Sequence, residues 1–101
     1  MVVACKAAAV PPGEGKRIEI PGHAPIAIFN VDGKFYAIDD TCTHGNASLC
    51  EGFLDGRVIE CPFHSGSFDV VTGEALAYPA TAPVTAYGVR MEGGDIVLDL
   101  D

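Results

Sequence analysis

Residues 41–68 read TCTHGNASLCEGFLDGRVIECPFHSGSF. This stretch is rich in Cys, His, Gly and Ser, and it contains two short motifs that each pair one Cys with one His. The first motif is Cys42-Thr43-His44, and the second is Cys61-Pro62-Phe63-His64. We expect the stretch to form loops that are held by something other than a hydrophobic core of their own.

Two Cys and two His side chains can complete two kinds of metal site. One is a tetrahedral zinc site. The other is a [2Fe–2S] cluster in which two thiolates hold one iron and two imidazoles hold the other. Structural zinc sites usually pair Cys with Cys and His with His at short spacing. Here each motif mixes the two types, which favours the two-iron cluster because each loop can then supply one ligand to each iron.

The remainder of the chain has the patterns of short strands joined by tight turns. Residues 17–20 alternate polar and apolar side chains, and so do most of residues 95–100. Three dipeptides are typical of hairpin turns because their residues tolerate a positive φ. They are Asp32-Gly33 between expected strands 26–31 and 34–38, Asp55-Gly56 before expected strand 57–61, and Gly93-Gly94 between expected strands 84–91 and 95–100.

Helix signals are weak in this sequence. The longest candidate, residues 4–10, is stopped by Pro11-Pro12, and the seven prolines and twelve glycines interrupt the other segments. The sequence therefore predicts an all-β protein, a small antiparallel sandwich or barrel. The length of 101 residues fits a single domain covering residues 1–101.

The charge balance limits the classes of partner. Six Lys and Arg stand against fourteen Asp and Glu, so the formal net charge is −8 at pH 7. Such a chain repels phosphate backbones and anionic lipids, which argues against nucleic acid and membrane surfaces and in favour of a basic protein partner. No apolar run approaches the roughly 20 residues of a membrane helix, and no secretory signal is recognisable, so we expect a cytoplasmic protein. Cysteines there stay reduced, and the four cysteines are expected to be metal ligands or free thiols.

The two motifs, set in CTHGNASL (42–49) and CPFHSGSFDVVTGEA (61–75), resemble the Rieske iron–sulfur family. Within it, the chain is similar to the ferredoxins of bacterial aromatic-ring-hydroxylating dioxygenase systems. The resemblance implies a β-sandwich with a loop-rich cluster-binding subdomain, about residues 41–68, at one tip. It implies that Cys42 and Cys61 hold the buried iron of one [2Fe–2S] cluster, and that His44 and His64 hold the outer iron.

The resemblance also implies a function. The chain would be a monomeric one-electron carrier, not an enzyme, between a flavoprotein NAD(P)H reductase and a terminal Rieske non-haem iron oxygenase. Three alternatives stay open: a zinc-stabilised binding module, the Rieske portion of an oxygenase subunit, and the Rieske-like small subunit of a nitrite reductase. The short chain argues against the second, and the complete ligand set against the third.

Departures from the high-potential Rieske proteins predict a low reduction potential. The positions of the family's extra disulfide hold Ala47 and Phe63, and those of two hydroxyl donors to sulfur hold Gly66 and Phe68. Hydrogen bonds to sulfur favour the reduced state, and so their loss lowers the potential. The acidic chain further opposes reduction. We expect a potential near the low end of the Rieske range, about −150 mV.

The other candidate residues have ordinary interpretations. They are expected to be free thiols (Cys5 and Cys50), an exposed histidine (His23), packing aromatics (Tyr36, Tyr78 and Tyr87) and a solvated acidic pair (Asp39-Asp40).

Overall fold

The computed structural model describes residues 2–41, 48–62, 66–77 and 82–99. In these residues the secondary structure consists of strands and two single-turn 3₁₀ helices. The elements are β1 (Val2–Lys6), η1 (Ala7–Ala9), β2 (Gly15–Ile18), β3 (Ile26–Val31), β4 (Lys34–Asp39), η2 (Leu49–Glu51), β5 (Phe53–Asp55), β6 (Val58–Glu60), β7 (Ser67–Asp69), β8 (Ala75–Ala77), β9 (Ala86–Glu92) and β10 (Asp95–Asp99). The predicted all-β class is confirmed.

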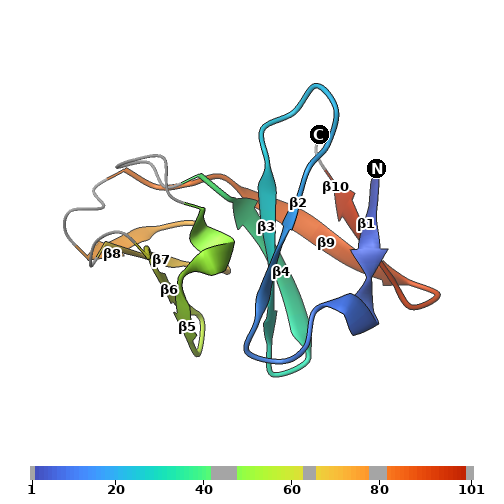
Figure 1. Cartoon of the computed structure of the whole chain (residues 1–101), viewed down its shortest axis with the longest axis horizontal. Coiled ribbons are helices and arrows are strands. Elements are labelled where there is room, and N and C mark those ends of the chain that lie inside the picture. Colours follow the sequence, from blue (N-terminus) through green and yellow to red (C-terminus); the bar gives the residue numbers. More distant parts are fainter. Residues whose placement is uncertain (1, 42–47, 63–65, 78–81, 100–101) are drawn as a thin grey trace.

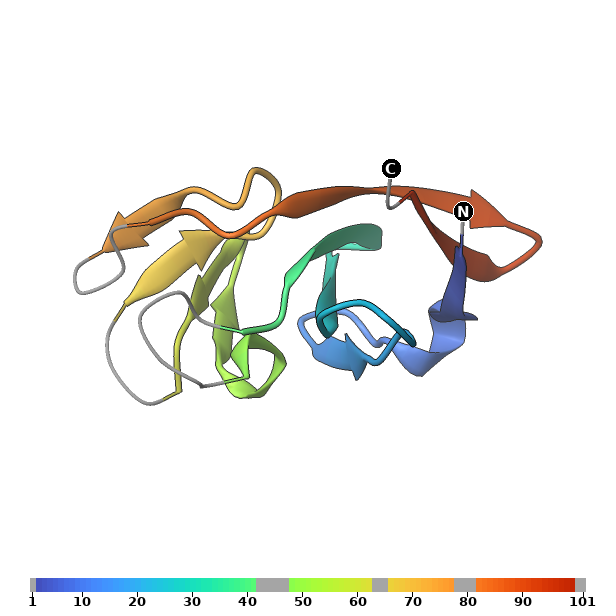
Figure 2. The ribbon, with the colours of Figure 1, turned by 90° about the horizontal axis from the view of Figure 1, so that it is seen from above.

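The strands form two antiparallel sheets. The large sheet has the order β1-β10-β9-β4-β3-β2, and the small sheet has the order β5-β6-β7-β8. The small sheet lies at one end of the molecule and β1 and β10 lie at the other (Figure 1). Seen from above, the segment that leads into β9 runs along the small sheet before β9 takes its place in the large one (Figure 2). The small sheet, residues 53–77, overlaps the predicted cluster-binding subdomain at about residues 41–68.

Strand β3 is buried on both faces, and this position explains its apolar sequence IAIFN. Alternate side chains of a strand point to opposite faces. One set enters an inter-sheet core, made of Ala27, Phe29, Ile38, Leu49, Ile59, Cys61, Phe68, Val70 and Val84. The other set enters a large-sheet core, made of Val10, Ile18, Ile26, Ile28, Ala37, Ile96 and Leu98. The two fully buried phenylalanines of the inter-sheet core each contribute roughly 1.5–3 kcal/mol to holding the tip on its base.

The hairpin predictions are confirmed at two turns and shifted by one residue at the third. Asp32-Gly33 has φ values of 52° and 89°, and Val31 pairs with Lys34 across it. Gly93-Gly94 likewise joins β9 to β10.

At the third turn, Asp55 belongs to β5 and pairs with Val58, so the loop is Gly56-Arg57 rather than Asp55-Gly56. Gly56 has a φ of 60° and is the first loop residue, which is the pattern of a type II′ turn. A turn of this type needs only one residue with positive φ, so Asp55 can stay in the strand. The expected strand 57–61 is accordingly shorter, Val58–Glu60.

No helix in the described ranges has the length and apolar character that crossing a membrane requires.

Candidate metal centre

The segments that carry both motifs leave the small sheet at the same end. The strand register pairs Phe53 with Glu60, Glu60 with Ser67, and Ser67 with Ala77. Cys61 follows Glu60 directly, at the end of β6, and η2 leads into β5 beside it. The end of β6, where Cys61 begins the second motif, and the start of β5, which follows η2, therefore lie at one end of the small sheet (Figure 1).

Asp40 and its neighbours join the two described flanks of the first motif segment, which we define as residues 42–47. Thr41 forms a β-bridge with Ser48, and the Leu49 N–H donates to the Asp40 carbonyl at 2.7 Å. The Asp40 carboxylate accepts hydrogen bonds from the Ser48 hydroxyl at 2.6 Å and from the Cys50 N–H at 3.0 Å. These contacts fix the two ends of residues 42–47 to each other.

Asp40 is the functional residue that sequence reasoning missed. We expected a solvated carboxylate, but Asp40 is 1% exposed, and the Arg17 guanidinium lies 3.7 Å from its Oδ2. A buried carboxylate must be compensated by hydrogen bonds or charge, and here the donors are the residues at the base of the loop. The available signal was the position of an Asp immediately before a ligand loop, since Asp side chains commonly accept hydrogen bonds from nearby loop amides.

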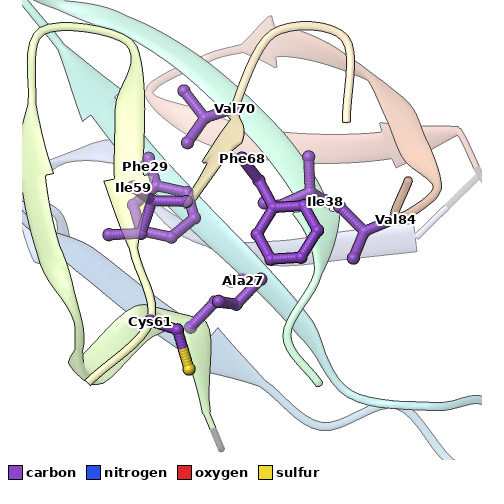
Figure 3. Close-up of a cluster of buried hydrophobic side chains, with 9 residues drawn as sticks. Ala27, Phe29, Ile38, Ile59, Cys61, Phe68, Val70 and Val84 are labelled. Carbon is purple, nitrogen blue, oxygen red and sulfur yellow. The ribbon is translucent and has the colours of Figure 1, made fainter. Parts of the chain in front are cut away.

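Cys61 lies at the base of the second motif segment. The Cys61 N–H donates to the Gly66 carbonyl at 2.8 Å, so the two described flanks of the second motif contact each other. Its side chain is 2% exposed and belongs to the inter-sheet core. Figure 3 shows Cys61 at the margin of that core, with its sulfur directed away from Ile59 and Val70.

The other three predicted ligands, Cys42, His44 and His64, lie outside the described residues, as do Ala47 and Phe63. The described residues alone contain no group of three or more His, Cys, Asp or Glu side chains able to hold a metal. The structure thus positions one predicted ligand and the chain on either side of the others.

The one predicted ligand among the described residues, Cys61, is compatible with a two-iron cluster of the Rieske type. Cys61 offers a buried sulfur at the edge of an apolar core, and no hydrogen bond from the described residues reaches this sulfur. A soft thiolate shielded from water is a suitable iron ligand. Phe68 stands where the resemblance to the Rieske family implies a hydroxyl donor in high-potential proteins, and its ring is fully buried in the inter-sheet core, so it supplies packing (Figure 3).

A salt bridge stabilises the small sheet beside the second motif. Arg57 donates to Asp69 Oδ2 through Nε at 2.9 Å and Nη2 at 2.7 Å, and the Val71 N–H donates to Asp69 Oδ1 at 2.8 Å. Burial raises the pKa of Asp69, but the hydrogen bonds from Arg57 and from the Val71 and Thr72 amides outweigh it, so that the pKa lies below its ordinary value. The carboxylate is thus kept ionised at the turn between β7 and β8.

A second contact ties the returning chain to the base. The Tyr87 hydroxyl donates to Asp39 Oδ1 at 2.5 Å, and the Thr85 N–H donates to Asp39 Oδ2 at 3.1 Å. Burial, together with the Asp39 carboxylate, raises the pKa of Tyr87 to about 12. His23, expected to be exposed, is half-buried because its ring packs edge-on against Tyr87 at 5.6 Å. Neither member of the Asp39-Asp40 pair is therefore a merely solvated charge.

Among the described residues, Cys5 and Cys50 take part in no disulfide bond. Cys5 lies in β1, and Cys50 lies in η2 within 3.1 Å of the Ser48 hydroxyl. Burial raises the pKa of both thiols, which keeps them protonated.

Gly52 allows η2 to lie against the end of β6. A Cβ at this position would be 2.0 Å from the Glu60 carbonyl oxygen, which is a backbone atom that cannot swing away. We expect Gly52→Ala to lower the free energy of unfolding by about 2–4 kcal/mol and to reduce iron loading, because the two motif segments must separate. The measurement is chemical denaturation together with iron analysis.

Gly88→Ala is the matched control, since a Cβ there meets only the Asp99 side chain at 3.4 Å. Equal stabilities for the two variants would contradict the close approach of η2 to β6.

The comparisons with known proteins agree with this geometry. A family profile for the Rieske [2Fe-2S] domain matches residues 1–88. The chain belongs to the Rieske [2Fe-2S] domain family. It binds a Rieske-type cluster by this membership, and the zinc alternative is set aside.

Individual members of the Rieske family resemble the chain over nearly its whole length. The 3-phenylpropionate/cinnamic acid dioxygenase ferredoxin subunit of Escherichia coli (strain K12) is 54% identical over 100 residues, covering 98% of this chain and 92% of the relative. The Sphingomonas yanoikuyae B1 ferredoxin has a TM-score of 0.95 and 42% identity, covering 99% and 98% of the two chains. A chain from a complex of reduced oxygenase and oxidised ferredoxin in carbazole 1,9a-dioxygenase has a TM-score of 0.91 and 45% identity, covering 96% and 90%. The Rieske protein described here is therefore an electron-transfer component rather than a catalytic subunit.

Proposed function

We propose that this Rieske protein carries single electrons from a flavoprotein NAD(P)H reductase to the terminal oxygenase of an aromatic-ring dioxygenase system. The observation that carries the proposal is the pair of Cys/His motifs on segments that start from one end of the small sheet, in a chain with ferredoxin relatives over nearly its full length. A Rieske cluster, when bound, takes up and releases one electron.

The proposed ligands are Cys42, His44, Cys61 and His64. We treat the chain as one domain, residues 1–101, with a cluster-binding subdomain at about residues 41–68. Support comes from the inter-sheet core, which includes Cys61 and joins the tip to β3 and β4. The contacts of Asp40 and of the Cys61 amide support the same assignment because they close the base of each motif segment.

The chain's own contribution to electron transfer is to hold the ligands in place and to bias the potential. Because the ends of the proposed ligand loops are held in place, the protein rearranges less when the site gains or loses an electron. The buried Cys61 keeps water from one side of the site. The net charge of −8 favours association with a basic partner and speeds the encounter at low ionic strength. We place the carrier, as a monomer, in the cytoplasm, where NAD(P)H-dependent reductases find their reductant.

The reduction potential tests the low-potential assignment. We expect a value of about −150 mV by protein-film voltammetry, because Gly66 and Phe68 supply no hydroxyl to sulfur and the acidic chain opposes an added electron. The expected spectrum of the dithionite-reduced protein is an electron paramagnetic resonance signal with the low average g-value of a His-ligated [2Fe–2S] centre.

A potential well above zero would contradict the low-potential carrier. A colourless protein that contains one divalent ion per chain would overturn the cluster and the function together.

A further inference from the structure

The outer face of the small sheet carries an unusual group of side chains on β5 and β6. The register pairs Phe53 with Glu60 and Asp55 with Val58, and alternation places all four on the same face. The result is a square in which the two apolar side chains occupy one diagonal and the two carboxylates occupy the other. We call this group, with Ser67 of β7, the β5–β6 face.

The β5–β6 face is hollow and exposed. Its five residues line a groove of about 410 Å³. Phe53 is 67% exposed, which is the largest exposure among the exposed large hydrophobic side chains of the described residues. An aromatic ring left in water costs free energy and commonly marks a binding surface.

The charges of the groove indicate what it would bind. Asp55 and Glu60 are exposed, and the described residues that line the groove include no Lys or Arg. The nearby Arg57 is occupied by Asp69 at 2.7 Å. A Lys or Arg side chain fits this surface, because its aliphatic stem can cover Phe53 and Val58 while its cation lies over the ring and between the carboxylates.

A second copy of this chain is a poor occupant. A two-fold contact would place Asp55 and Glu60 against the same residues of another molecule that also has a net charge of −8. The groove borders the end of the small sheet from which the motif segments leave, since Glu60 immediately precedes Cys61. A protein that meets that end can extend onto the β5–β6 face.

We propose that the β5–β6 face docks a Lys or Arg side chain from an apolar patch of the electron-accepting oxygenase. This assignment rests on the proposed function and names the surface through which it acts. An oxygenase is chosen because a related ferredoxin was solved in complex with one. Phe53 supplies the central contact, and Asp55 supplies charge on the side farther from the motif segments.

The test uses the full holoprotein and the oxygenase component of the E. coli 3-phenylpropionate/cinnamic acid dioxygenase. The reduced carrier is mixed with the oxidised oxygenase, and the rate is followed against oxygenase concentration and salt. We expect Phe53→Ala to weaken apparent binding about tenfold or more, as for a central aromatic contact, and Phe53→Trp to retain binding. Asp55→Asn should weaken binding and reduce its dependence on salt.

Matched controls are Val3→Ala, which removes an exposed hydrophobic side chain from β1, and Glu92→Gln, which removes an exposed charge from β9. Both lie on the large sheet, so we expect binding within about twofold of the wild type. The visible spectrum of all five variants should be unchanged, and the potential should shift no more in Phe53→Ala and Asp55→Asn than in the matched controls, which separates docking from damage to the metal centre.

The possible outcomes distinguish a failure of the proposed docking face from a failure of the proposed electron-carrier function. Normal transfer by Phe53→Ala and Asp55→Asn overturns the docking face and leaves the carrier function standing. The docking face is also overturned if these variants are impaired only in their reduction by the reductase. It is likewise overturned if the wild type sediments as a dimer and these variants sediment as monomers. A wild-type protein that passes no electron to the oxygenase overturns both.

Discussion

Replacing Cys42, His44, Cys61 or His64 by Ala, one at a time, is expected to abolish the visible absorption and the low-g signal of the reduced protein. Each change removes one of the four ligands that the proposed site requires, and a Rieske cluster with three protein ligands is not retained. The measurements are iron and sulfide content, the absorption spectrum and electron paramagnetic resonance.

Residues of the same types provide the controls. Cys5→Ala and His23→Ala are expected to keep the full spectrum, because the Cys5 thiol in β1 and the His23 ring have contacts unrelated to the motif pairs. Cys61 is buried in the inter-sheet core, so its replacement can also lower stability. His64→Ala therefore provides an independent test of the ligand set, and circular dichroism shows whether this variant is folded. A His64→Ala protein with unchanged visible absorption would contradict the ligand set.

Asp40→Ala is expected to lower the free energy of unfolding by about 3 kcal/mol and to reduce the amount of cluster retained during purification. The substitution leaves the Ser48 hydroxyl and the Cys50 N–H without their acceptor in a buried place. It also removes one of the two carboxylates that contact the Arg17 guanidinium, the other being that of Glu19. The measurements are chemical denaturation and the ratio of visible to ultraviolet absorption.

Two further variants test whether the loss of stability in Asp40→Ala comes from the lost hydrogen bonds. Ser48→Ala removes one of the two donors and is expected to cost about 1 kcal/mol. Asp55→Ala removes an exposed carboxylate from the same tip and is expected to cost no more than about 0.5 kcal/mol. If Asp40→Ala is as stable as Asp55→Ala and holds as much cluster, Asp40 has no role in closing the first motif segment.

The hairpins show which features of the fold were readable in advance. Asp32-Gly33 and Gly93-Gly94 were located correctly because a tight turn depends on the φ preferences of the turn residues themselves. At Asp55-Gly56 the signal was right but the register was one residue off, since a single glycine is compatible with either placement until the strands pair. That register now places Phe53, Asp55, Val58 and Glu60 on one face.

The core shows the same limit. The apolar run of β3 indicated a buried strand, but it did not indicate that opposite faces enter two different cores. That division depends on the small sheet packing against one face of β3 while Ile96 and Leu98 of β10 pack with the side chains of the other face. Residues brought together in this way are far apart along the chain.

Spacing and residue chemistry along the chain were enough to predict the all-β class, two of the three hairpin turns and the Cys/His pairs that carry the resemblance to the Rieske family, because each depends on neighbours within a few positions. Packing of the two sheets was needed to bury Asp40 beneath the first motif segment, to join Asp39 to Tyr87 and to leave Phe53 in the open. An aspartate or a phenylalanine has the same local preferences wherever it stands. Its burial and its partners are set by which distant strands the folded chain places beside it.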